Sequence, residues 1–130
     1  MRVYLVRHAE AEPGEPDELR TLTEHGRWQA QDLARRFTRR GVRPEAVLSS
    51  PLLRARQTAD AIAAEAGVTA EPDERLAPGA TAEDLRSVVA GRGDTVVVVG
   101  HQPDCGQIAA AISGAAAPAF PAAGVCELEL

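Results

Sequence analysis

The sequence has few aromatic residues and contains neither lysine nor asparagine. Aromatic residues make up 3% of the 130 residues, too few for the stacking platform that binds single-stranded nucleic acid. The 14 basic residues, all arginine, are outnumbered by 19 acidic residues, which gives a net charge of −5. An acidic chain of this kind is poorly suited to coat DNA. We therefore expect no nucleic-acid partner.

Cysteine and long apolar runs are also scarce. Cys105 and Cys126 are too few and too far apart for a CxxC redox pair or a four-ligand zinc site. We interpret them as two small buried side chains, with a single disulfide as the alternative. The longest apolar runs, such as 96–99, fall far short of the ~20 residues that span a bilayer. Arg7 also ends the first apolar run too early for a signal-peptide core, so we expect no membrane association and a cytoplasmic location.

Short apolar runs alternate with segments of helical periodicity along the whole chain. We expect buried strands at 3–6, 46–48 and 95–99, a weaker strand at 68–71, and a half-exposed edge strand at 126–130. We expect helices from Thr23 to Gly41, over 53–66, from Thr81 to Val89, and from Pro103 to Gly114. The alternation predicts an α/β fold, a three-layer α/β/α sandwich around a mostly parallel sheet. The length fits one domain, residues 1–130.

Four residues that suit phosphate chemistry follow three of the expected strands. Arg7 and His8 end the first strand, Arg54 comes soon after the second, and His101 follows the strand at 95–99. Ligands of such sheets bind beyond the carboxyl ends of the strands, so these side chains are expected at one rim. Arginine presents a planar fork to phosphoryl oxygens, and histidine can attack phosphorus or donate a proton.

Three ordered motifs contain these residues: LVRHAE at 5–10, SPLLRARQT at 50–58 and VGHQP at 99–103. Together they resemble the signatures of the histidine phosphatase (phosphoglycerate mutase-like) superfamily. The resemblance implies the phosphoglycerate mutase-like fold and a hydrolase. It also implies that His8 is the nucleophile that becomes phosphorylated, and that Arg7, Arg54 and His101 bind the phosphoryl group. Ser50 and Gln57 are further candidates for substrate binding, although capping and packing explain them equally well.

The chain departs from the family at one position. Many members carry a general-acid Glu in an Arg-Leu-x-Glu segment, whereas residues 75–78 read RLAP and place Pro78 there. This departure and the short chain resemble the compact SixA-type phosphohistidine phosphatase branch. Glu10, Glu83 and Asp104 remain possible substitute acids.

Three functions are therefore weighed. The first is a phosphatase acting on a protein phosphohistidine, and the second is a small-molecule phosphomonoesterase of the same superfamily. The third, a catalytically idle phosphate-binding adaptor domain, is disfavoured by the intact His8. We expect no cofactor and no metal, because the guanidinium groups of Arg7 and Arg54 supply positive charge and would repel a cation from His8, Glu10 and His101. The expected partner is a phosphorylated substrate.

Overall fold

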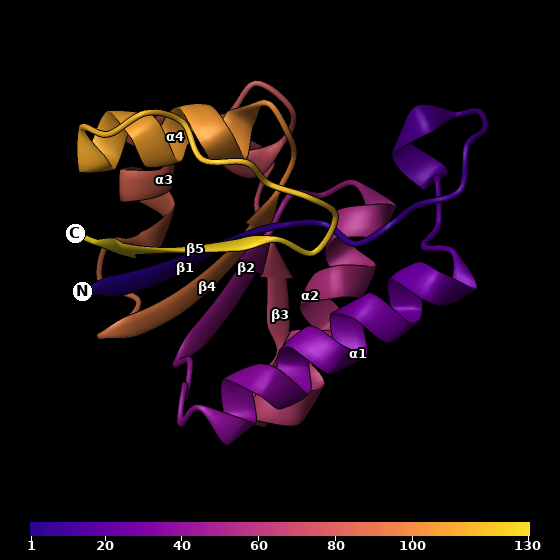
Figure 1. Ribbon diagram of the computed structural model, residues 1–130, viewed down its shortest axis with the longest axis horizontal. Helices are drawn as coiled ribbons and strands as arrows, with labels where there is room; N and C mark the ends of the chain where they lie inside the picture. The colour runs from indigo at the N-terminus through magenta and orange to yellow at the C-terminus, as the bar shows by residue number, and fades with distance from the viewer.

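The computed structural model describes residues 1–130, and its helices and strands alternate along the chain (Figure 1). The elements are, in order, β1 (Arg2–Arg7), η1 (Asp17–Leu19), α1 (Glu24–Arg39), β2 (Ala46–Ser49), α2 (Leu53–Ala66), β3 (Ala70–Pro72), η2 (Glu74–Leu76), α3 (Ala82–Val89), β4 (Thr95–Gly100), α4 (Asp104–Ser113) and β5 (Val125–Glu129). No helix combines the length and the apolar character needed to cross a bilayer.

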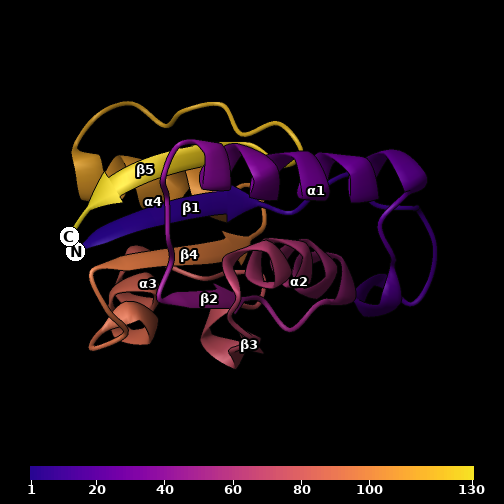
Figure 2. The same cartoon turned by 90° about the horizontal axis from the view of Figure 1, so that it is seen from below.

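One five-stranded sheet, ordered β3-β2-β4-β1-β5, forms the middle layer. Helices α1 and α2 cover one face, and α3 and α4 cover the other (Figures 1 and 2). Each face has its own apolar core, because successive strand residues point to opposite faces. Val97 and Val99 pack with α1 and α2, whereas Val96 and Val98 pack with α3 and α4. The predicted three-layer α/β/α sandwich is therefore confirmed.

Local sequence signals account for the helix boundaries. The hydroxyl of Thr23 accepts a hydrogen bond from the Gly26 amide at the start of α1. At α3, Thr81 and Asp84 form a reciprocal capping box. Gly67 ends α2 in the left-handed conformation, with φ of 75°, which a glycine adopts without strain. The helix at 53–66 lies where the sequence predicts it.

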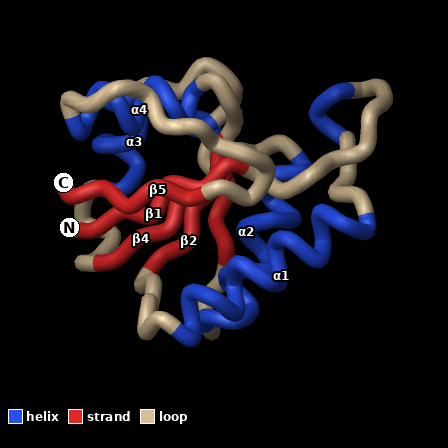
Figure 3. The backbone as a smooth tube through the Cα atoms, in the orientation of Figure 1, coloured by secondary structure: helices blue, strands red, loops and turns tan.

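The parallel pairing sets the position of the site. Strand β4 lies between β1 and β2, with Val99 opposite both Val6 and Ser49. The carboxyl ends of these three strands therefore meet at one edge of the sheet. Figure 3 shows the loops that leave these strands gathered beyond that edge.

The remaining elements differ from the prediction in part. The half-exposed edge strand is present as β5, which pairs antiparallel with β1 and buries Leu128. Strand β3 lies at Ala70–Pro72 rather than at 68–71. The 3-10 helices η1 and η2 were not predicted, because three residues are too few to show a period. Both cysteines are free thiols, and only Cys105 is fully buried.

Candidate active site

His8 and His101 face each other at the edge of the sheet where β1 and β4 end. Their ring centroids lie 5.3 Å apart at an interplanar angle of 60°. The backbone amide of His8 donates to the Gly100 carbonyl at 3.0 Å, which extends the β1–β4 pairing by one residue. The strand register therefore brings together two imidazoles that are 93 residues apart in sequence.

The ring of His8 is held by one hydrogen bond. Its Nδ1 lies 2.7 Å from the Ala9 carbonyl oxygen, so Nδ1 carries the proton and Nε2 keeps its lone pair. Burial, the largest cause, together with the charges of Arg54, Arg7 and Arg20 lowers the pKa of His8 to about 4, against the opposing Ala9 hydrogen bond. Arg7 is the neighbour of His8 in sequence, but burial lowers this pKa more than the arginine charges do. His8 is therefore a neutral imidazole at neutral pH.

His101 is buried and bonded to Ser50. Its Nε2 lies 2.7 Å from Ser50 Oγ, and the same Oγ accepts a hydrogen bond from the Leu52 amide at 3.2 Å. We infer that the Ser50 hydroxyl donates to Nε2 and that Nδ1, which has no partner in the protein, carries the ring proton. Burial lowers the pKa of His101 to about 4, with the charges of His8 and Arg54 adding to the effect. Ser50 therefore orients a neutral His101 as a hydrogen-bond donor.

Arg7 and Arg54 are the remaining two candidate residues at the strand ends, and only some of their N–H groups have hydrogen-bond partners. Arg7 Nη1 donates to the Phe120 carbonyl at 3.0 Å, which ties the loop before β5 to the site. Three buried side-chain nitrogens in the structure have no hydrogen-bond partner: Arg7 Nε, Arg54 Nε and His101 Nδ1. Buried polar groups are rarely left unpaired without a reason such as a ligand. All three are donors, so they fit an anion.

Two residues that sequence reasoning missed also belong to this region. Asp17 in η1 binds Arg54, through its backbone oxygen at 2.8 Å and its carboxylate at 3.2 Å. The same carboxylate accepts a hydrogen bond from Arg20 at 3.0 Å. Neither residue lies in a motif, so the only signal was the run of acidic residues in the loop after β1.

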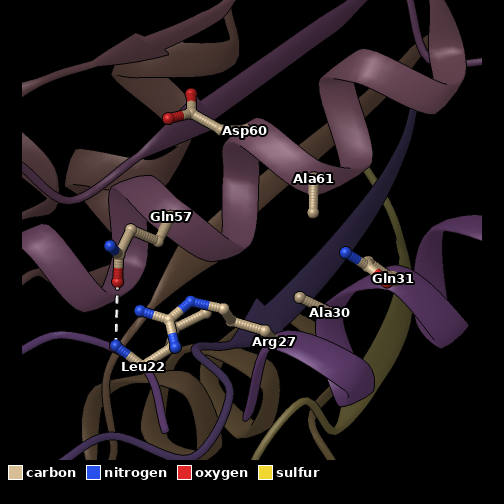
Figure 4. A pocket seen from close by; sticks show the side chains of 7 residues that line it. All are labelled: Leu22, Arg27, Ala30, Gln31, Gln57, Asp60 and Ala61. Atoms are coloured by element: carbon tan, nitrogen blue, oxygen red, sulfur yellow. Dashed lines mark hydrogen bonds between the residues drawn. The ribbon is translucent and has the colours of Figure 1, made fainter. Parts of the chain in front are cut away.

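Gln57, a predicted substrate ligand, lines a cavity that is separate from the two candidate catalytic histidines (Figure 4). Its Oε1 accepts a hydrogen bond from the Leu22 amide at 2.8 Å, which attaches the end of the loop before α1 to α2. The cavity holds about 230 Å³ and is lined by neither histidine nor by Arg7 or Arg54. In this structure Gln57 supports the loop, while Ser50 contacts His101 directly.

The three possible acids lie at different places. The Glu10 carboxylate accepts a hydrogen bond from the Thr23 hydroxyl at 2.9 Å, at the start of α1. A Cβ on Gly26 would collide with the Glu10 carbonyl oxygen, so glycine is needed for this loop to lie against α1. Glu83 is exposed in the first turn of α3. Asp104 accepts from the Gly79 amide at 2.8 Å, next to Pro78.

No group of three histidine, cysteine, aspartate or glutamate residues is arranged to hold a metal ion. What the strand ends offer is one neutral imidazole with a free lone pair, surrounded by arginine and histidine N–H donors. Such a set can attack an electrophile and stabilise a developing negative charge on its oxygens.

Comparison with known families identifies the motifs. The model of the histidine phosphatase superfamily (branch 1) matches residues 3–78, more than half of the chain. An uncharacterized protein of Picosynechococcus sp. is 39% identical over 121 residues, which cover 87% of this chain and 73% of that protein. Residues 3–78, which the family model matches, include the motifs at 5–10 and 50–58.

Solved structures of similar proteins share the whole fold. The protein histidine phosphatase SixA, solved in complex with tungstate, is 27% identical with a TM-score of 0.90. The alignment covers 100% of this chain and 88% of that one. SixA from Agrobacterium tumefaciens is 32% identical with a TM-score of 0.81, over 97% and 89% of the two chains. The phosphoglycerate mutase-like fold implied by the motifs is thereby confirmed.

Proposed function

This chain belongs to the histidine phosphatase superfamily and is a phosphatase, and we propose that it hydrolyses phosphohistidine on a protein through a phosphorylated His8. In this proposal His8 is the nucleophile, and Arg7, Arg54 and His101 bind the phosphoryl group. Residues 1–130 act as one histidine phosphatase domain. The reaction requires no metal ion.

The observation that carries the proposal is the set of unpartnered donors beside His8. Arg7 Nε, Arg54 Nε and His101 Nδ1 are buried and unpaired, and Arg7 and Arg54 both lower the pKa of His8. The tetrahedral oxyanion in the similar SixA structure is of the class that such donors bind. A phosphoryl group would give each of the three nitrogens an acceptor.

The first step is attack by His8. Its Nε2 lone pair forms a bond to phosphorus while the bond from phosphorus to the substrate imidazole breaks. The proton stays on Nδ1, and its hydrogen bond to the Ala9 carbonyl stabilises the cationic ring that forms. Arg7, Arg54 and His101 stabilise the charge spread over the equatorial oxygens.

The second step returns His8 to its resting state. A water molecule attacks phosphorus from the side vacated by the leaving group, and the bond to Nε2 breaks. The water loses its protons to solvent and phosphate, and neutral His8 leaves easily because its pKa is low.

The substrate class follows from Pro78. An alkoxide is a poor leaving group, so ester hydrolysis gains greatly from a placed general acid. A phosphohistidine protonated on its distal ring nitrogen departs as neutral imidazole and needs no such acid. Proline at position 78 therefore favours a phosphoramidate, or an ester with an activated leaving group, over an alkyl phosphate.

The experiment is a substrate panel combined with trapping of the phosphoenzyme. We expect kcat/KM for a phosphohistidine protein to exceed that for sugar phosphates and nucleotides, and acid-labile phosphate to appear on His8 after rapid mixing. The His8→Ala variant, mixed in the same way, is the control and should carry no label.

Each other outcome has a defined meaning. A sugar phosphate or nucleotide as the best substrate would contradict the phosphohistidine assignment and support the small-molecule phosphomonoesterase. No turnover of any substrate, with phosphate still bound, would support the adaptor domain. Label on wild-type protein at a residue other than His8 would overturn the nucleophile assignment.

A further inference from the structure

Asp17 is an exposed residue that holds a buried guanidinium. Its side chain is 56% exposed, whereas that of Arg54 is 8% exposed. It lies in η1, in the loop between β1 and α1, outside the three sequence motifs. The two residues are 37 positions apart, so tertiary structure alone brings them together.

The contacts engage one edge of the Arg54 guanidinium. The Asp17 backbone oxygen accepts from Nη1 at 2.8 Å, and its Oδ2 accepts from Nη2 at 3.2 Å. A guanidinium has a second edge, formed by the Nε hydrogen and the other Nη2 hydrogen, which fits two oxygens of a phosphoryl group. Nε on that edge is buried and has no partner. Asp17 therefore fixes the plane of Arg54 and leaves the anion-binding edge free.

The other carboxylate oxygen of Asp17 binds a second arginine. Oδ1 accepts from Arg20 Nη1 at 3.0 Å, while Arg20 Nε donates to the Glu12 carbonyl at 2.7 Å. Arg20 is close enough for its charge to act on the His8 ring. One carboxylate thus holds two cations that lie near the two candidate catalytic imidazoles.

We propose that Asp17 is a positioning residue of the phosphatase reaction, which acts by orienting Arg54 toward the phosphoryl group. The inference rests on the proposed function, because it takes Arg54 to be a phosphoryl ligand. A bidentate anchor reduces the rotamer freedom of a long side chain, so less entropy is lost when the transition state forms. Without the anchor, the guanidinium must be ordered by the substrate itself.

The test is a double-mutant cycle with p-nitrophenyl phosphate as the substrate. The proteins are wild type, Asp17→Ala, Arg54→Ala and the double variant. We expect Asp17→Ala to lower kcat by about tenfold and to add almost nothing in the Arg54→Ala background, because coupled residues are not additive. Glu18→Gln, a neighbouring exposed acid in the same 3-10 helix, is the matched control and should keep wild-type kcat.

Failure of this inference differs from failure of the proposed function. Wild-type kcat for Arg54→Ala would overturn the phosphoryl-binding role that the proposed function gives to Arg54, and with it the role of Asp17. A slow Arg54→Ala together with a fully active Asp17→Ala would overturn only the role of Asp17. An equal fold-loss from Asp17→Ala in both backgrounds would show a general structural role and also overturn it.

A second substitution guards against misfolding. Asp17→Asn keeps the size of the side chain and the backbone contact, but it replaces one of the two accepting carboxylate oxygens with an NH₂ donor and removes the negative charge. We expect an unchanged unfolding temperature and a smaller loss of kcat that again disappears in the Arg54→Ala background. Wild-type kcat in folded Asp17→Asn and Asp17→Ala would contradict the proposal.

Discussion

Ser50 Oγ lies 2.7 Å from His101 Nε2, and this buried hydrogen bond joins the end of β2 to the end of β4. The Leu52 amide donates to the same Oγ, and we infer that the hydroxyl hydrogen is donated to the ring. This arrangement leaves the Nδ1 proton of His101 as the donor available to a ligand. Ser50 thus sets the tautomer of a histidine rather than contacting solvent.

Ser50→Ala is therefore expected to impair both stability and activity. The substitution leaves His101 Nε2 buried without a partner, which costs about 1–3 kcal/mol in the free energy of unfolding. Without the serine hydroxyl, the His101 ring can carry its proton on Nε2 instead of on Nδ1, so kcat/KM should fall by about tenfold or more. Urea unfolding and steady-state kinetics measure the two effects. Ser49→Ala, at the adjacent buried serine whose hydroxyl donates to the Ser50 carbonyl and not to a histidine, is the control; equal kcat/KM losses would refute the tautomer argument.

His8→Ala should abolish turnover and retain the binding of vanadate or phosphate. The nucleophile is lost, while the donors on Arg7, Arg54 and His101 remain. Calorimetric titration with vanadate and an activity assay separate binding from chemistry. His25→Ala is the control, since His25 is exposed and its ring stacks on that of Trp28, with the ring centroids 5.9 Å apart. Turnover near the wild-type rate in His8→Ala would refute the nucleophile assignment.

The half-buried His8 and the buried His101 should make the fold less stable in mild acid. Burial lowers the pKa of both His8 and His101 to about 4, below the ~6.5 of an unfolded histidine. Between these values the unfolded chain binds protons that the folded chain does not. The free energy of unfolding should therefore fall as the pH drops from about 6.5 toward 4, by at most about 1.4 kcal/mol per pH unit for each histidine.

Urea unfolding at several pH values above about 4.5 measures this dependence. The His8→Ala/His101→Ala double variant should show a flatter profile, because it lacks both groups. An equal slope in the double variant and in wild type would show that other residues cause the acid sensitivity.

Pro78→Glu should reduce the ratio of kcat/KM for a phosphohistidine protein to kcat/KM for an alkyl phosphate. A carboxylic acid at this position could protonate an alkoxide leaving group, so kcat/KM for an alkyl phosphate should rise while that for a phosphohistidine protein changes little. Pro78→Gln has a similar size without the acid and controls for loss of the proline. A similar rise in Pro78→Gln would attribute the gain to the loop instead of to acid catalysis.

Chelating agents should leave the activity unchanged. The positive charge around the phosphoryl group is assigned to Arg7 and Arg54, so no step of the proposed mechanism draws on a metal ion. Assays with and without a chelator, after dialysis, measure this. Activity that is lost on chelation and restored by added metal would contradict the metal-free mechanism.

The layers of the fold and the place of the candidate site could be predicted from sequence patterns. Apolar spacing at Ala55, Ala59 and Ile62 predicts the buried face of α2, and the valine run predicts a central strand, because burial follows the period of the element. His8 and His101 each follow a strand, and parallel strands end at one edge, so their proximity could be predicted without coordinates. The family was recognisable from the same residues.

The contacts that support those residues could not be predicted in this way. Asp17 meets Arg54 across 37 positions, Ser50 meets His101 across 51, and the Phe120 carbonyl meets Arg7 across 113. Such contacts depend on loop paths and side-chain rotamers, which leave no periodic pattern in a sequence. The dominant cause of the low pKa of His8 is equally tertiary. Burial depends on what the whole chain packs around the ring, whereas the neighbouring Arg7 could be read directly from the sequence.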